Sequence, residues 1–305
     1  MEKKEIGGLL GGILPEDRIL RDEPMANHTS FRIGGPADFY VAPQTVEELQ
    51  AVLALCHGKG IPLQVLGNGS NLLVRDGGIR GIVVEVYRNF SGIRFLEGGK
   101  VKAQAGILLS KLAGAVWKEG LGGFEFASGI PGTLGGAVFM NAGAYGGEMK
   151  DILLEVQALE MDGTLTTFPA EALELEYRHS VFHHRPAVVL EATLQLVPGD
   201  RQAIKERMRE LNAQRKMKQP LELPSAGSTF KRPEGYFAGK LIMDAGLRGV
   251  SIGGAQVSEK HCGFVVNKGQ ASCQEVQDLI AHIQDTVFQQ YGVRLEPEVK
   301  IIGEP

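Results

Sequence analysis

The pattern of apolar and polar positions predicts strands and helices that alternate along the whole chain. Short apolar runs bounded by glycine or proline are typical of strands, and apolar residues that recur every three or four positions are typical of helices. On this basis we expect helices over 46–57, 108–119, 200–218 and 273–291. We expect strands at 39–42, 63–66, 72–74, 81–86, 100–105, 152–161, 164–168, 188–197 and 299–302. The predicted fold class is α+β.

Two of these helices begin with the same local signature. Thr45 with Glu48, and Ser272 with Glu275, fit the capping box, in which a hydroxyl and a carboxylate three residues apart each accept a backbone N–H. Gly292 follows the last apolar position of the second helix, where a left-handed residue commonly ends a helix. The glycine-rich segment 58–62 ends the first helix.

Composition narrows the class of protein. The 305 residues are 43% hydrophobic and 22% charged, which is typical of a globular protein of two domains. A net charge of −4 argues against nucleic acid as a partner. The basic side chains of the 200–218 helix (Lys205, Arg207, Arg209, Arg215, Lys216 and Lys218) are therefore expected to form a solvated face.

Cysteine and histidine give no metal or disulfide signal. Three cysteines without C-x-x-C spacing indicate neither a disulfide framework nor a zinc site, and Cys56 is expected to be a buried, inert thiol. The histidines 28, 179, 183, 184 and 261 share no metal-ligand spacing. In an extended strand, His183 and His184 would point to opposite faces. We expect no catalytic metal.

No apolar run approaches the length of a membrane span. The N-terminal stretch 1–14 is short, broken by glycines and followed by Pro15 and Glu16, so it does not fit a signal peptide. We expect a cytoplasmic, reduced protein without membrane insertion.

Glycines are concentrated in one segment, 124–149, where apolar residues are interleaved with them. Glycine costs about 0.5–1 kcal/mol relative to alanine inside a regular element, so this density needs a reason. One such reason is a backbone that closely approaches a large ligand and offers N–H groups to a phosphate. A flexible linker would lack the apolar residues. We therefore predict an ordered cofactor cradle.

A second glycine loop, G-N-G-S-N at 67–71, fits either a phosphate loop or a plain hairpin turn. The dinucleotide fingerprint of the Rossmann fold is absent. In the 67–72 run, Leu72 replaces the third glycine and a strand follows, and in the 129–136 run Pro131 removes a donor. A dinucleotide would have to sit on the loops 67–71 and 129–136 of a different fold.

Six motifs occur in the order of a known family. They are N-H-T-S-F-R-I-G-G-P-A (27–37), V-L-G-N-G-S-N-L-L-V (65–74), S-G-I-P-G-T-L-G-G-A-V-F-M-N-A-G-A-Y-G (128–146), Y-R-H-S-V-F (177–182), S-A-G-S-T-F-K-R-P (225–233) and L-E-P-E-V (295–299). With them the chain resembles the UDP-N-acetylenolpyruvoylglucosamine reductases (UDP-N-acetylmuramate dehydrogenases) of peptidoglycan precursor synthesis. The short interval between 178 and 225 resembles the compact second subtype.

This resemblance implies a fold and a cofactor. The fold is a two-part, vanillyl-alcohol-oxidase-like (PCMH-like) FAD-binding domain over 1–88 and 89–215, followed by a smaller α+β substrate domain over 216–305. Because 65–74 contains no histidine, the FAD should be noncovalent. The implied FAD-binding residues are Leu66, Gly67, Asn68, Gly69, Ser70, Asn71, Gly129, Ile130, Pro131, Gly132, Thr133, Gly135, Gly136, Asn141, Ala142 and Gly143.

The resemblance also implies a reaction. NADPH supplies a hydride that passes through the flavin to the enolpyruvyl methylene carbon of the UDP-sugar, and charge develops on the neighbouring carbon. By the same resemblance, Arg178 stabilises this enolate, Ser228 donates the proton, and Glu298 lies alongside. The implied substrate-binding residues are Tyr177, Gly227, Lys240 and Lys268. A monomer is expected.

Two other functions are compatible with parts of the sequence. An FAD oxidase of the same fold would use oxygen and a small alcohol or hydroxy acid, but it would not need Ser228, Glu298 and Lys240 together. A nucleotide-sugar binding protein without catalysis would hold only the ligand diphosphate on its glycine loops and would be colourless.

Overall fold

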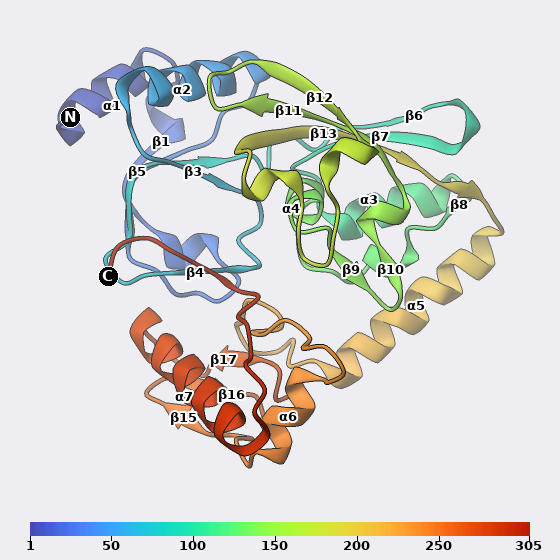
Figure 1. The fold of residues 1–305 in the computed structure, drawn as a ribbon. Coiled ribbons are helices and arrows are strands. Elements are labelled where there is room, and N and C mark those ends of the chain that lie inside the picture. The colour runs from blue at the N-terminus through green and yellow to red at the C-terminus, as the bar shows by residue number, and fades with distance from the viewer. The chain divides into compact units, whose positions relative to one another are not determined.

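The computed structural model describes residues 1–305, and its chain divides into two compact units. Unit 1 comprises Met1–Leu20, Phe39–Asn68 and Gly81–Arg215, and unit 2 comprises Arg21–Asp38, Gly69–Arg80 and Lys216–Pro305. The α-helices, labelled in Figure 1, are α1 (Lys3–Gly11), α2 (Val46–Lys59), α3 (Leu109–Lys118), α4 (Leu134–Phe139), α5 (Arg201–Lys218), α6 (Ala238–Asp244) and α7 (Cys273–Tyr291).

The largest sheet of unit 1 has five antiparallel strands in the order β12-β11-β13-β7-β6. These strands are β6 (Ile93–Phe95), β7 (Lys100–Gln104), β11 (Leu153–Glu160), β12 (Leu165–Pro169) and β13 (Ala187–Gln195). Helix α4 contacts β13 and β7, and Figure 1 shows the strands side by side. Apolar residues of α3, α4 and these strands, including Leu112, Val138 and Val156, form one buried core.

A second core lies between two helices and a four-stranded sheet with the order β1-β2-β5-β3. The strands are β1 (Ile19–Pro24), β2 (Pro36–Val41), β3 (Leu63–Leu66) and β5 (Ile79–Glu85), and β3 runs parallel to β5. Leu10 of α1 and Leu53 of α2 are fully buried in this core with Ile82 of β5. Cys56 is buried there as expected, and burial raises the pKa of its thiol to about 11.

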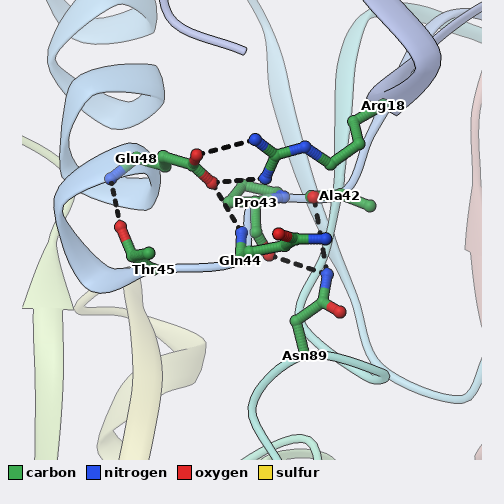
Figure 2. A network of polar contacts seen from close by, with 7 residues as sticks. All are labelled: Arg18, Ala42, Pro43, Gln44, Thr45, Glu48 and Asn89. Carbon is green, nitrogen blue, oxygen red and sulfur yellow. Dashed lines mark hydrogen bonds and ion pairs between the residues drawn. The ribbon is translucent and has the colours of Figure 1, made fainter. Parts of the chain in front are cut away.

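The N-terminus of α2 differs from the predicted capping box. The Thr45 hydroxyl accepts the Glu48 N–H at 3.2 Å, as expected. The Glu48 carboxylate, however, accepts the Gln44 N–H at 2.7 Å and two N–H groups of Arg18 at 2.6 and 2.8 Å (Figure 2). The hydrogen bond with Arg18 holds the pKa of Glu48 below its usual value. The Glu48 carboxylate therefore links the residue before β1 to the N-terminus of α2. At the other end of this helix, Gly60 has a left-handed φ of 63° and ends it.

Unit 2 packs α6 and α7 with a three-stranded sheet of order β15-β16-β17. Its strands are β15 (Ser251–Ile252), β16 (Ala255–Val257) and β17 (Val265–Asn267), and a parallel pair joins β4 (Leu72–Val74) to β18 (Lys300–Ile302). Here the predicted capping box of α7 is confirmed, because Ser272 and Glu275 accept each other's backbone N–H. Gly292 ends α7 with φ of 68°, also as predicted.

Four two-residue strands complete the fold: β8 (Leu121–Gly122) with β14 (Val197–Pro198), and β9 (Gly143–Ala144) with β10 (Gly147–Glu148). The other predicted strands and the helix at 200–218 are confirmed within a few residues. All three cysteines are free and buried. None of the helices combines the length and apolar character that crossing a bilayer requires.

Candidate functional site

The two predicted glycine loops meet inside unit 1. A Cβ on Gly67 would lie 2.6 Å from the Oγ1 atom of Thr133, so only glycine allows this approach of the loop 67–71 to the loop 129–136. Strand β3, before the first loop, pairs with β5, and β4, after it, pairs with β18. Because β3 and β4 do not pair with each other, the alternative of a plain hairpin turn is wrong.

The loop after Gly129 leads into α4, and its side chains cap that helix. The hydroxyl of Thr133 accepts the Gly136 N–H at 3.4 Å. Several amides of this loop are used inside the protein: Ile130 donates to Ala127 O, and Gly135 donates to Ala105 O at 2.8 Å. The amides of Gly129, Gly132 and Thr133 are therefore the better candidates for an anionic ligand group.

Not all of the glycine-rich segment serves this loop. Gly143 and Gly147 belong to the β9–β10 hairpin, whose two central residues, Tyr145 and Gly146, both have positive φ (55° and 89°). Such a turn suits a two-residue hairpin. A Cβ on Gly147 would lie 2.8 Å from the ring of Phe126. A tight turn and packing therefore explain these glycines without a ligand, and their contact with a cofactor stays a prediction.

Arg215 is a candidate site residue that the sequence interpretation did not include. It was expected on a solvated face of α5, but its Nε is buried and has no hydrogen-bond partner. Burial lowers the pKa of its guanidinium, and the Tyr145 side chain partly offsets this effect. A Cβ on Gly129 would lie 3.3 Å from Nε of Arg215 and would overlap the Asn212 side chain. A buried donor beside a glycine loop fits an anionic ligand group. The one feature of the sequence that could have pointed to Arg215 is its position in the last turn of α5.

Arg178 lies on a tight turn of unit 1. Glu176 and His179 exchange both backbone hydrogen bonds, and Arg178 has a left-handed φ of 57°. The guanidinium carbon of Arg178 lies 5.1 Å from the ring centroid of the exposed Tyr177. The turn is thus held at its base and presents both side chains.

Asn141 anchors this turn to α4. Its buried side chain donates to Glu176 O at 3.0 Å and to Glu148 Oε2 at 2.8 Å, and it accepts the Lys150 N–H at 2.9 Å. On the other side of the turn, the Ser180 hydroxyl donates to Phe139 O at 2.7 Å. Asn141, which the resemblance placed at the cofactor, therefore also positions the segment that carries Arg178.

Unit 2 brings together three predicted site residues, Asn71, Ser228 and Glu298. The Glu298 N–H donates to Thr229 O at 2.8 Å, next to Ser228, and Phe230 forms an antiparallel bridge with Pro297. The Asn71 side chain donates to Glu298 O at 3.3 Å, and the Lys300 N–H donates to Asn71 O. Ser228 and Glu298 are both half-buried, on neighbouring extended segments.

The motif N-H-T-S supports the second half of the first glycine loop within unit 2. The Ser30 N–H donates to Gly69 O at 3.1 Å, and a Cβ on Gly69 would overlap His28 O. Gly69 also has a positive φ of 58°. The backbone of 28–30 therefore fixes this part of the loop and requires glycine at 69.

The remaining predicted substrate residues show weaker signs of a site. Lys240 is exposed on α6 and pairs with Asp244 at 2.7 Å, and this hydrogen bond raises its pKa. Lys268 is exposed, and its N–H donates to Gly254 O. Gly227 has a positive φ of 77°, and a Cβ there would meet nothing within 4 Å. Their role in substrate binding stays a prediction.

Comparison with known proteins agrees with this geometry. Residues 37–168 match the family model of an FAD-binding domain. Alkyldihydroxyacetonephosphate synthase, which is 17% identical, shares the fold with a TM-score of 0.51 over 65% of this chain and 41% of its own. The chain is therefore a protein with an FAD-binding domain of the PCMH-like fold, as predicted.

The second part of the chain narrows the class. Residues 219–302 match the C-terminal domain of UDP-N-acetylenolpyruvoylglucosamine reductase. The enzymes of that name from Alkaliphilus oremlandii and Clostridioides difficile are 53% and 52% identical to the chain, each over 100% of both sequences. The enzyme of that name from Thermus caldophilus is 36% identical in sequence. Its crystal structure superposes with a TM-score of 0.79 over 93% of this chain and 97% of its own. The chain belongs to the UDP-N-acetylenolpyruvoylglucosamine reductase family.

The residues of unit 1 fit an FAD molecule. The close approach of Gly67 to Thr133 and the buried, unpartnered Nε of Arg215 beside Gly129 suit a ligand with a pyrophosphate. The sequence 65–74 contains no histidine for a covalent bond to the flavin.

Proposed function

We propose that this protein is an FAD-dependent oxidoreductase that uses NADPH to reduce UDP-N-acetylglucosamine enolpyruvate to UDP-N-acetylmuramate, a peptidoglycan precursor. The observation that carries the proposal is membership of the family at 53% identity over the full length of both sequences. The matched length spans the segments that hold both glycine loops and Arg178, Ser228 and Glu298.

The reaction sets two demands on the protein. Bound FAD supplies the hydride chemistry that links NADPH to the enolpyruvyl double bond. Negative charge then develops toward the substrate carboxylate, and a carbon must be protonated. The protein therefore has to supply fixed positive charge and a proton donor.

Arg178 is our candidate for the fixed charge. A guanidinium stays protonated in proteins and offers donors in a fork that matches a carboxylate. The turn at 176–179 and its anchor on Asn141 support the assignment, because a charge that stabilises a developing enolate must be held before the reaction.

Ser228 is our candidate for the proton donor, with Glu298 beside it. A serine hydroxyl is a very weak acid, but a carbanion-like acceptor is basic enough to take its proton. The backbone bridge between the segments of Ser228 and Glu298 supports the pair, since it holds both within one part of unit 2. The Glu298 carboxylate would orient the hydroxyl by accepting its hydrogen bond, and water would restore the proton that Ser228 gives up.

The remaining assignments belong to the same proposal. FAD would bind noncovalently at the predicted loop residues of an FAD domain formed by 1–88 and 89–215, and the UDP-sugar would bind in 216–305 with help from Tyr177, Gly227, Lys240 and Lys268. We further propose a monomer that works in the cytoplasm.

An anaerobic visible spectrum of the purified protein tests the function. NADPH should bleach the flavin bands, and UDP-N-acetylglucosamine enolpyruvate should restore them without air. Flavin that returns only with oxygen would favour an FAD oxidase. A protein that stays colourless after FAD is added would favour a nucleotide-sugar binding protein.

A further inference from the structure

Three metal-ligating side chains converge at the base of the turn that carries Arg178. The ligand atoms of Glu174, His179 and His184 all lie within 4.8 Å of one another. His184 Nε2 and Glu174 Oε2 are 3.4 Å apart. A tetrahedral zinc ion with bonds of about 2.0–2.1 Å places neighbouring ligand atoms about 3.4 Å apart. One ligand pair therefore already has the required spacing.

The backbone explains why residues five and ten positions apart meet here. Glu174 adopts a left-handed φ of 50° after a short 3-10 helix at 170–173. The Glu176–His179 bridge then folds the chain back, and a second 3-10 helix, Val181–His183, brings His184 round to Glu174. Because His183 and His184 lie at the end of a helical turn, the prediction based on an extended strand does not apply to them.

A column of neighbouring rings orients His179, one of the three ligands. The ring centroids of Phe139 and His183 are 4.3 Å apart, and those of His183 and His179 are 4.9 Å apart. His184 stacks in turn on His179 at 6.0 Å. The column limits the rotation of His179, and metal ligands that are oriented in advance bind more tightly.

The other two ligands can adjust. The side chains of His184 and Glu174 are 56% and 54% exposed, so an ion can reach them from solvent and they can rotate toward it. This freedom suffices to bring the third ligand atom from within 4.8 Å to the spacing of a metal shell.

We propose that Glu174, His179 and His184 bind one divalent transition-metal ion, for which Zn²⁺ is the best match. Two imidazole nitrogens and one carboxylate oxygen suit zinc, whereas Mg²⁺ and Ca²⁺ prefer shells made of oxygen. Three protein ligands leave the fourth position to water. The ion would link residue 174 to residue 184 and so restrain the turn that presents Tyr177 and Arg178.

Metal titration of the complete, flavin-loaded protein tests the site. Calorimetry with Zn²⁺ should give one equivalent bound, and Co²⁺ should show the strong visible bands of a tetrahedral site at wavelengths longer than those of flavin. His184→Gln and Glu174→Gln should each weaken binding by about tenfold or more. His57→Gln, which alters an exposed histidine on α2, is the matched control and should bind as the wild type does. Equal affinity in all four proteins, or equal competition by Mg²⁺, would overturn the proposal.

Amide hydrogen exchange tests the effect on the turn without reference to activity. Zn²⁺ should slow exchange over 174–184 in the wild type and in His57→Gln, but not in His184→Gln. Unchanged exchange in a wild-type protein with zinc bound would show that the ion does not restrain this turn.

Discussion

The two segments that carry the candidate catalytic residues are held in different ways. In unit 1, Arg178 lies on a turn with a left-handed backbone, anchored by the side chains of Asn141 and Ser180. In unit 2, Ser228 and Glu298 lie on extended segments that pair through their backbones. Side-chain anchors depend on the identity of single residues, whereas backbone pairing tolerates most substitutions.

This difference matches the roles that we propose for the two segments. A turn that stores backbone strain can aim a long charged side chain at one point, at a cost that the anchors must offset. A bridge between extended segments can keep two short side chains close together without a special residue at each position. Substitutions of the anchors should therefore affect the two segments unequally.

The largest effect is expected from Ser228→Ala. Loss of the proposed proton donor should slow flavin reoxidation by the enolpyruvyl substrate about 10²–10⁴-fold, the usual contribution of general acid catalysis. Reduction by NADPH should survive, and stopped-flow spectra under anaerobic conditions separate the two half-reactions. Ser91→Ala, at an exposed position of unit 1, is the control. Unchanged reoxidation would remove Ser228 from this role.

Asn141→Ala should produce the next largest effect and test the side-chain anchor. It removes three hydrogen bonds, leaves the Lys150 N–H without its partner and leaves Glu176 O with only the His179 N–H, at a cost of about 3 kcal/mol in the free energy of unfolding. Urea denaturation measures this loss, and Asn27→Ala, which loses one exposed hydrogen bond, should change it little. Equal stability of the two variants would contradict the anchoring role.

Thr229→Val tests the counterpart in unit 2 and should cost less. The Thr229 hydroxyl oxygen accepts the buried Val265 N–H at 2.8 Å, while its backbone carries the pairing with Glu298 and Gly263. Valine keeps the shape and the backbone bonds but leaves one N–H unpaired, for about 1–3 kcal/mol. Thr229→Ser retains the oxygen and serves as the control. A valine variant as stable as the serine variant would show that this bond contributes nothing.

The smallest effect should come from pH. Burial lowers the pKa of His261, whose Nδ1 accepts the Gly263 N–H at 3.1 Å, and Gly263 O in turn accepts the N–H of Thr229, next to Ser228. Because the unfolded chain binds this proton more readily, His261 favours folding above about pH 6.5, and that stability is lost as pH falls toward the lower folded pKa. Melting temperatures measured across this range should fall less steeply in His261→Gln. If the melting temperatures of the wild type and His261→Gln fell equally with pH, His261 would not be the group responsible.

The sequence predicted the longer helices α2, α3, α5 and α7 and about half of the strands, but not α1, α4, α6 or the β15-β16-β17 sheet. Helices such as α7 could be predicted because their caps and apolar stripes are local: Ser272, Glu275 and Gly292 act on their own helix. The Thr45–Glu48 pair has the same signature, yet Arg18, thirty residues earlier, takes part of its carboxylate. The residues of α2 and its N-terminus therefore do not reveal that Arg18 competes for the Glu48 carboxylate.

The residues of the candidate site also fall into two groups, those that a local motif reveals and those that only the fold reveals. Glycines 67 and 129–136 and the residues Arg178, Ser228 and Glu298 could be found because their motifs are contiguous. Their roles stay predictions. The buried Nε of Arg215 and the cluster of Glu174, His179 and His184 could not be found from spacing. Burial of Nε depends on the loop packed against α5, and the cluster depends on left-handed turns that bring its members together.

The sequence alone thus determined the longer helices, about half of the strands, the cap of α7 and the family resemblance, because each depends on residues that are neighbours in the chain. Only the tertiary structure decided which glycines lie where the two loops meet and which form a hairpin, that Nε of Arg215 is buried, and that Asn141 anchors the turn of Arg178. The physical reason is that desolvation and hydrogen-bond competition depend on partners distant in sequence, which periodicity does not encode.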